Sequence, residues 1–328
     1  MPDITMQRRD ALRAAAMVAL TGRSWAQGSG WPTKPVNMVV PFPAGGGTDA
    51  FARPLAAQFA KSTGKTLVID NRGGAGGTVG ASYAAKAHAD GYNYFMGGTH
   101  HVIAPSVYAR LDYDLERDFV PLALLASVPQ VIVVNPRTVG AKTIQDLIAE
   151  LRRKPGSFNY ASAGAGTSHH LAGELFKLQT NTFITHIPYR GAGPALNDVV
   201  AGQVPIIFDN LPSALPFVKA GKLVPIVVSA PTRLKELPNV PTFKEVGLEP
   251  VNRLAYYGLL GPKGLPKDVV DKLNEATRKA VEDPAVRKRI EDTGSIIVAN
   301  TPEQFAQQIK AEFDVYKEVV KKQKLTLD

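Results

Sequence analysis

The 328-residue sequence contains no cysteine, which excludes disulfides, thiolate catalysis and zinc sites built on cysteine. This absence fits an oxidising compartment without proving one. Beyond the N-terminal region no run of about 18 apolar residues occurs, so we expect the mature chain to be soluble. Basic stretches with interleaved aromatic residues are also missing, so the net charge of +9 does not indicate a nucleic-acid partner. The densest basic cluster, residues 287–289, lies among acidic residues in a helical pattern and is interpreted as a solvated helix face.

The first 26 residues have the pattern of an export signal. Three arginines between residues 8 and 13 precede a short run of small apolar residues, and Ser24-Trp25-Ala26 forms a small-x-small cleavage site. The pattern predicts cleavage near Ala26 and a periplasmic location. Arg8-Arg9 also hints at the twin-arginine export route. The alternative interpretation is an ordinary amphipathic first helix.

Strand-like and helix-like patterns alternate from the start of the mature chain, which predicts an α/β fold built on mainly parallel sheets flanked by helices. The expected strands have short apolar runs, at residues 36–40, 67–69, 92–96, 158–161, 183–187, 206–208, 223–228 and 253–260. The expected helices include residues 50–61, 82–89 and 171–178. The apolar stretch 122–134 is broken at Pro129 and could carry the chain into a second lobe.

These patterns predict two lobes joined by two crossings, with a cleft between them. Lobe 1 is expected to comprise residues 27–129 and 253–328, and lobe 2 residues 130–252. The crossings are expected near residues 127–133 and 252–258. Two helices carry capping-box sequences, Thr143 with Asp146 and Thr301 with Gln304, and Pro302 stands at the first helical position of the second.

Glycine-rich or small polar loops follow several of the expected strands. The stretch "PFPAGGGTDA" at 41–50 spends three glycines at one strand-to-helix junction, which costs backbone entropy unless bare amides are needed there. Helix N-termini with exposed amides favour anions, and the carboxyl ends of parallel strands meet at one edge of a sheet. The loops therefore predict anion binding through backbone amides and short hydroxyls, or else merely tight turns.

Several kinds of chemistry fit these loops poorly. The first loop lacks the Lys-Ser/Thr pair of a triphosphate-binding loop. Gly74, Gly76 and Gly80 form GxGxxxG, one residue longer than the dinucleotide fingerprint, which leaves a dinucleotide-dependent enzyme acting on a small acid as the alternative function. No GxSxG elbow occurs. Adjacent histidines on one helical turn point to different sides, so the pairs at 100–101 and 169–170 do not predict a metal site. A purely structural interpretation is that His169 packs at a helix start and His170 is exposed. We therefore expect that the protein is not an enzyme and that it binds neither a cofactor nor a metal.

Five stretches taken together resemble one known family. They are "PFPAGGGTD" at 41–49, "VIDNRGGAGGTVGA" at 68–81, "NYASAGAGTSHHLAGELF" at 159–176, "IPYRGAGPALNDVVAGQV" at 187–204 and "PNVPTFKEVG" at 238–247. Over essentially the whole mature chain, the sequence is similar to Bug-type periplasmic solute receptors of tripartite tricarboxylate transporters. The resemblance implies a two-lobed, type II Venus-flytrap receptor that closes over a carboxylated solute and delivers it to a membrane permease. The resemblance implies that the protein binds the solute without converting it chemically.

The resemblance also implies which residues hold the solute. The loop from Phe42 to Asp49 would hold one end, and the loop from Ser162 to His169 would hold a carboxylate at its helix start. Asp209 falls where the family often has an acidic cleft residue, although a helix cap is the alternative. The ligand class would be a di- or tricarboxylate, an amino acid or an aromatic acid, and the receptor is expected to be a monomer. The complete set of predicted ligand-binding residues is Phe42, Ala44, Gly45, Gly46, Thr48, Asp49, Gly76, Thr99, His100, Ser127, Ser162, Gly164, Gly166, Thr167, Ser168, His169 and Asp209.

Overall fold

The computed structural model describes residues 31–323. Residues 35–323 belong to one unit, and residues 31–34 belong to a separate N-terminal segment. The predicted export signal, residues 1–26, lies outside the described residues. Among the residues that are described, no helix is both long enough and apolar enough to cross a bilayer.

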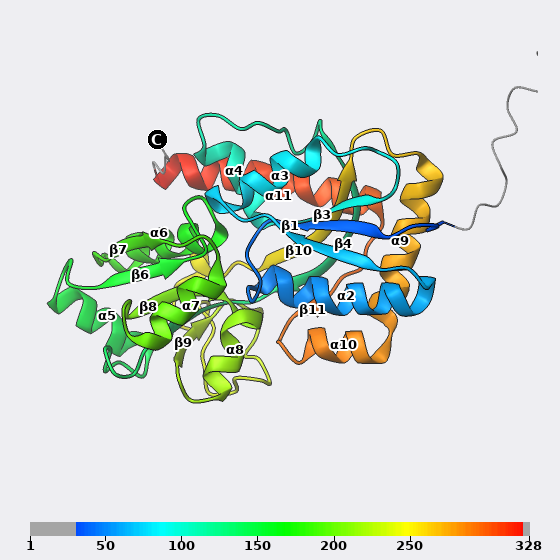
Figure 1. The fold of residues 1–328 in the computed structure, drawn as a ribbon. Helices are drawn as coiled ribbons and strands as arrows, with labels where there is room; N and C mark the ends of the chain where they lie inside the picture. The colour runs from blue at the N-terminus through cyan, green and yellow to red at the C-terminus, as the bar shows by residue number, and fades with distance from the viewer. Residues whose placement is uncertain (1–30, 324–328) are drawn as a thin grey trace, which may run out of the picture. The chain divides into compact units, whose positions relative to one another are not determined.

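The strands of the main unit form two sheets (Figure 1). The first sheet has the order β11-β4-β10-β3-β1-β2, with β1 Val36–Val40, β2 Leu67–Asn71, β3 Asn93–Gly98, β4 Phe119–Val128, β10 Ala255–Pro262 and β11 Ile296–Ile297. The second has the order β7-β6-β8-β5-β9, with β5 Gln130–Val134, β6 Asn159–Ser162, β7 Thr185–Pro188, β8 Ile206–Asn210 and β9 Val224–Val228. The chain leaves the first sheet at Pro129 and returns to it at β10. The α/β class predicted from the sequence is confirmed.

The predicted strand direction needs a correction, because both sheets are mixed. In the first sheet β1 pairs in parallel with β2 and β3, whereas β10 runs antiparallel to β3 and β4. In the second sheet β6 pairs in parallel with β7 and β8, whereas β5 runs antiparallel to β8 and β9. The difference comes from β5 and β10, since each runs against the direction of the βα units in its sheet. β4 pairs antiparallel with β10 and therefore runs in the same direction as β3. The parallel part of each sheet carries the glycine-rich loops.

Helices flank both sheets (Figure 1). Those packed with the first sheet are α2 Gly47–Thr63, α3 Thr78–Ala85, α4 Thr99–Val107, α9 Lys267–Glu282, α10 Pro284–Glu291 and α11 Pro302–Gln323. Those packed with the second are α5 Ile144–Arg153, α6 Ser168–Thr180, α7 Ala192–Ala201 and α8 Leu211–Lys219. Two short 3₁₀ helices, η1 Ala75–Gly77 and η2 Glu249–Val251, complete the elements of residues 31–323.

Both predicted capping sequences cap their helices. The Thr143 hydroxyl accepts from the Asp146 amide at 3.1 Å, and the Gln304 amide donates to the Thr301 hydroxyl at 3.3 Å. The helix expected at 82–89 is α3, which begins earlier, at Thr78. Gly77, with φ +95°, ends η1 and forms the N-cap, so the helical turn starts before the alanine-rich stretch that suggested it.

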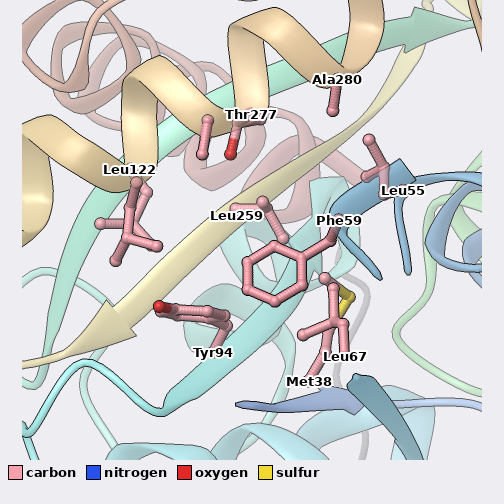
Figure 2. Close-up of a pocket in the computed structure, with 11 residues that line it drawn as sticks. Met38, Leu55, Phe59, Leu67, Tyr94, Leu122, Leu259, Thr277 and Ala280 are labelled. Carbon is pink, nitrogen blue, oxygen red and sulfur yellow. The ribbon is translucent and has the colours of Figure 1, made fainter. Parts of the chain in front are cut away.

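The core of the first sheet contains a small apolar cavity between the sheet, α2 and α9. Its volume is about 30 Å³, and the side chains of Met38, Phe59, Tyr94 and Leu259 are among those that surround it (Figure 2). A space of this size holds about one water molecule, but its walls offer few polar partners. It is therefore a gap in the packing and not a ligand site.

Candidate functional site

The predicted loops lie at the carboxyl ends of the parallel strands, in both sheets. In the first sheet they follow β1, β2 and β3, and in the second they follow β6, β7 and β8. Each of these strands leads into a helix, so helix N-termini gather at both edges. Such edges of α/β sheets are where ligands bind.

The loop after β1 is organised by Asp49, which is 3 % exposed. The Gly45 amide donates to Asp49 Oδ2 at 3.1 Å, and Arg53 Nε donates to the same oxygen at 2.7 Å. Asn71 Nδ2 also binds the loop, at the Phe42 carbonyl, over 2.8 Å. The Asp49 carboxylate therefore fixes the shape of the loop, and one of its amides is already engaged within the chain.

The loop after β6 is organised by short hydroxyls. The Gly164 amide donates to Ser162 Oγ at 3.1 Å, and Ser162 Oγ lies 2.6 Å from His186 Nε2. Thr167 is the N-cap of α6: its hydroxyl donates to the Gly164 carbonyl at 2.7 Å and accepts from the His170 amide at 3.3 Å. These bonds leave the first amide of α6, that of Ser168, pointing out of the loop.

The loops of the two sheets contact each other directly. The Ser168 amide donates to His100 Nδ1 at 3.1 Å, and the Tyr108 hydroxyl donates to the Ala165 carbonyl at 2.9 Å. Asn210 Nδ2 donates to the Tyr257 hydroxyl at 2.6 Å. Each bond joins a residue attached to one sheet to a residue attached to the other. The predicted first- and second-sheet loops are thus brought together around the N-terminus of α6.

Apolar contacts accompany these bonds. Phe42 packs with Ala163 and Ala192 in a small buried cluster, and its ring meets the His100 ring edge-on at 5.1 Å. A Cβ added to Gly76 would lie 2.5 Å from the Ala165 carbonyl oxygen. Glycine at this position therefore permits the loop after β2 to approach the loop after β6.

Three buried histidines lie at this contact, and burial lowers the pKa of each. The pKa of His100 is shifted well below its ordinary value, with the neighbouring His169 and His101 contributing, and the pKa values of His101 and His169 are lowered to about 4. The His100 ring is therefore neutral near pH 7, as its role as acceptor from the Ser168 amide requires. Both ring nitrogens of His169 are buried without a hydrogen-bond partner among the described residues.

Asp209 ends β8 next to this group. Its Oδ1 accepts from the Asn210 amide at 2.8 Å, its Oδ2 accepts from Ser213 Oγ at 2.6 Å, and burial raises its pKa to about 7. The nearest nitrogen of His169, Nδ1, lies 3.7 Å from Oδ1. Asp209 does not cap α8, because the N-cap is Asn210 and no side chain accepts from the first amides of the helix. Its complete burial puts a titratable carboxyl beside the contact between the loops.

Two predicted residues have other neighbours. Thr99 Oγ1 accepts from the Tyr256 amide at 2.9 Å and so ties α4 to β10. Ser127, on β4, borders a separate cavity beside α11. The expectation that His170 is exposed is wrong: its side chain is buried, and its ring stacks on His186 at 4.1 Å. Tyr108, Asn210 and Tyr257 were missed, because a single polar group in an apolar run carries no sign of the distant partner it will meet.

The glycine loop after β2 serves packing. A Cβ on Gly80 would lie 2.8 Å from the Arg72 carbonyl oxygen and from Pro41 Cα, so this glycine permits α3 to approach the loop after β1. Within residues 31–323, no group of three or more histidine, aspartate or glutamate side chains is arranged to hold a metal ion.

The unit has two mixed sheets flanked by helices, the chain crosses between them twice, and their glycine-rich loops meet. This is the architecture of the periplasmic binding protein class. A family model described as the tripartite tricarboxylate transporter family receptor matches residues 51–325. The chain belongs to this receptor family, as its resemblance to Bug-type receptors predicted. It is therefore a receptor, and the family gives no support to a dinucleotide-dependent enzyme.

Solved structures agree with this assignment. The chain is similar to the periplasmic binding protein BugD, with 32% identity, a TM-score of 0.88 and coverage of 90% of this chain and 100% of BugD. It is similar to a Rhodopseudomonas palustris protein solved with adipate, at 33% identity and TM-score 0.87, over 90% and 100% of the two chains. It is also similar to MatC of Rhodopseudomonas palustris, solved with bound malate, at 33% identity and TM-score 0.84, over 88% and 100%.

Proposed function

We propose that this protein is a periplasmic receptor that captures a small dicarboxylate between the loops of its two sheets and delivers it to the membrane subunits of a tripartite transporter. Residues 27–129 with 253–328 and residues 130–252 act as the two lobes. The chain crosses between them near residues 127–133 and 252–258. The related proteins solved with adipate and malate support this ligand class.

The observation that carries the proposal is the Ser168 amide at the start of α6. A helix N-terminus favours negative charge, and here it is buried where the loops of both sheets meet. This amide donates to a neutral imidazole from the opposite sheet, which is a weaker acceptor than a carboxylate. A solute carboxylate that replaced His100 would gain a charge-assisted hydrogen bond.

Capture follows from the contact between the two sets of loops. A solute that contacts the loops of only one sheet makes only part of its possible contacts. Binding therefore selects the arrangement in which the loops of both sheets contact it. The loop after β1 and the first turn of α2 supply the second set, with Gly46 and Thr48 buried there. Phe42 closes the apolar side of this space.

Calorimetric titration with malate and adipate tests the proposal. We expect the wild-type protein to bind at least one of them. We expect Thr167→Val to weaken binding, because the hydroxyl that fixes this loop and orients the start of α6 is lost, and such an N-cap is worth about 0.5–2 kcal/mol. The matched control is Thr143→Val, which removes the same kind of N-cap from α5 and should cost stability, about 0.5–2 kcal/mol, without changing affinity. Failure to bind either acid, or equal affinity losses in both variants, would contradict the proposed site.

Delivery is tested in cells. A strain that lacks this receptor should lose uptake of the radiolabelled acid that the purified protein binds, and the wild-type gene should restore it. The Thr167→Val gene should restore it poorly at low solute concentration. Unchanged uptake in the deletion strain would show that the receptor is not required for transport of that acid.

A further inference from the structure

A second cavity, of about 430 Å³, lies beside the segment that returns the chain to the first sheet. Its walls come from both parts of the unit: Ser127 on β4, Ala230 and Pro231 after β9, residues 252–256, and one face of α11. This volume falls within the range of about 300–1,000 Å³ that is typical of small-molecule sites. No residue of the glycine-rich loops lines this cavity.

Two groups of opposite charge line this cavity with unfilled hydrogen-bonding atoms. Among the described residues, Arg253 Nε and Glu312 Oε2 are both buried and have no hydrogen-bond partner. The other oxygen of Glu312 accepts from Gln308 Nε2 at 3.1 Å. Among the ion pairs of the described residues, none joins Arg253 to Glu312 within 4.0 Å. The two side chains are only partly buried, but a buried polar atom without a hydrogen-bond partner is costly, so a ligand that supplies an acceptor to Arg253 Nε and a donor to Glu312 Oε2 is favoured.

We propose that this cavity is a binding site for a free amino acid, whose carboxylate pairs with Arg253 and whose ammonium group pairs with Glu312. A molecule with both charges satisfies both unfilled atoms at once, which neither a simple acid nor a simple amine does. Leu254, Pro231 and the partly exposed Val315 offer apolar surface to its side chain.

The protonation of Glu312 fits this arrangement. Burial raises its pKa to about 7, while the hydrogen bond from Gln308 and the positive charge of Arg253 oppose the rise. The other titratable groups facing it, Tyr256 and Tyr316, have raised pKa values and are neutral. An ammonium group favours the ionised carboxylate, so binding near pH 7 should release protons.

The cavity also borders the proposed solute site. Arg253 and Tyr316 line a small adjoining space together with Gln130 and Ser168, the residue that begins α6. A ligand held by Arg253 therefore contacts residues of both sheets next to the segment that joins them.

The experiment measures Tm with millimolar L-leucine and with two matched compounds, 4-methylpentanoate, which lacks the ammonium group, and 3-methylbutylamine, which lacks the carboxylate. We expect leucine to raise the Tm by about 2 °C or more and the matched compounds not to do so. The shift should be lost in Arg253→Gln and in Glu312→Gln and kept in Arg278→Gln, an exposed control. It should also persist in Thr167→Val, which separates this site from the solute site.

Calorimetry in two buffers of different ionisation enthalpy provides the second readout. Proton release on leucine binding near pH 7, absent in Glu312→Gln, is the expected result. The proposal is overturned if leucine gives no shift, if both matched compounds shift the Tm as much as leucine, or if the shift survives in Arg253→Gln. Circular dichroism of each variant without leucine checks that it is folded.

Discussion

His100 places a neutral imidazole at the point where the proposed function needs an anion. Its Nδ1 accepts from the Ser168 amide, so a solute must displace this ring before it can use the N-terminus of α6. We expect His100→Ala to bind malate more tightly, by roughly 2- to 10-fold, since a neutral hydrogen bond that no longer competes is worth about 0.5–1.5 kcal/mol. Calorimetric titration of the variant against the wild type measures this difference.

The control at the residue scale is His88→Ala. His88 is exposed, so its replacement removes a histidine without touching the contact between the loops. Its affinity for malate should equal that of the wild type. Weaker binding by His100→Ala would show instead that the ring contacts the solute, which would make His100 part of the recognition surface.

Among the elements, η1 and the loop before α6 meet through Gly76. Its φ of +61° favours glycine, and a Cβ there would also press on the Ala165 carbonyl oxygen. We expect Gly76→Ala to weaken solute binding because the two loops can no longer approach. Gly64→Ala is a matched control, since Gly64 has a φ of +67° at the end of α2 and a Cβ added there would meet nothing within 4 Å.

Both glycine variants should lose about 1 kcal/mol of stability from backbone strain, and Gly76→Ala should lose more because its Cβ also meets the Ala165 carbonyl oxygen. Only Gly76→Ala should lose affinity for malate or adipate. Thermal denaturation and calorimetric titration of the two variants side by side measure these effects. Equal affinities would mean that the contact between η1 and the loop after β6 does not matter for capture.

The sequence predicted the elements better than their partners. Apolar runs such as Val36–Val40 and the capping sequence at Thr143 are local signals, and both formed as expected. The antiparallel strands within the sheets were missed, since an apolar run such as Gln130–Val134 looks the same whether its neighbours are parallel or antiparallel. The His100–Ser168 bond spans 68 residues, and no local pattern encodes such a pair. The loops were found because glycine and short hydroxyls mark them locally.

At the scale of the whole molecule, buried titratable groups make stability depend on pH. Burial lowers the pKa of five histidines, including His101 and His169 to about 4 and His186 to about 3. Below pH 6.5 these histidines bind protons in the unfolded chain but stay neutral in the folded one, so the free energy of unfolding falls as the pH is lowered. The pKa values of Asp209 and Glu312, both raised to about 7, act in the opposite direction, because the folded state keeps their protons as the pH rises through about 4 to 7.

Five histidines outweigh two carboxyl groups, so the free energy of unfolding should fall as the pH is lowered from about 6.5 toward 4. Urea unfolding followed by circular dichroism at several pH values measures this slope. His186→Gln should make it shallower by up to one proton, about 1.4 kcal/mol per pH unit, because it removes a histidine that stays neutral when folded. His88→Gln, at an exposed position, should leave it unchanged. Stability that stayed constant or rose on acidification would mean that the five histidines are protonated in the folded state. It would then also contradict the neutral state of the His100 ring that accepts from the Ser168 amide.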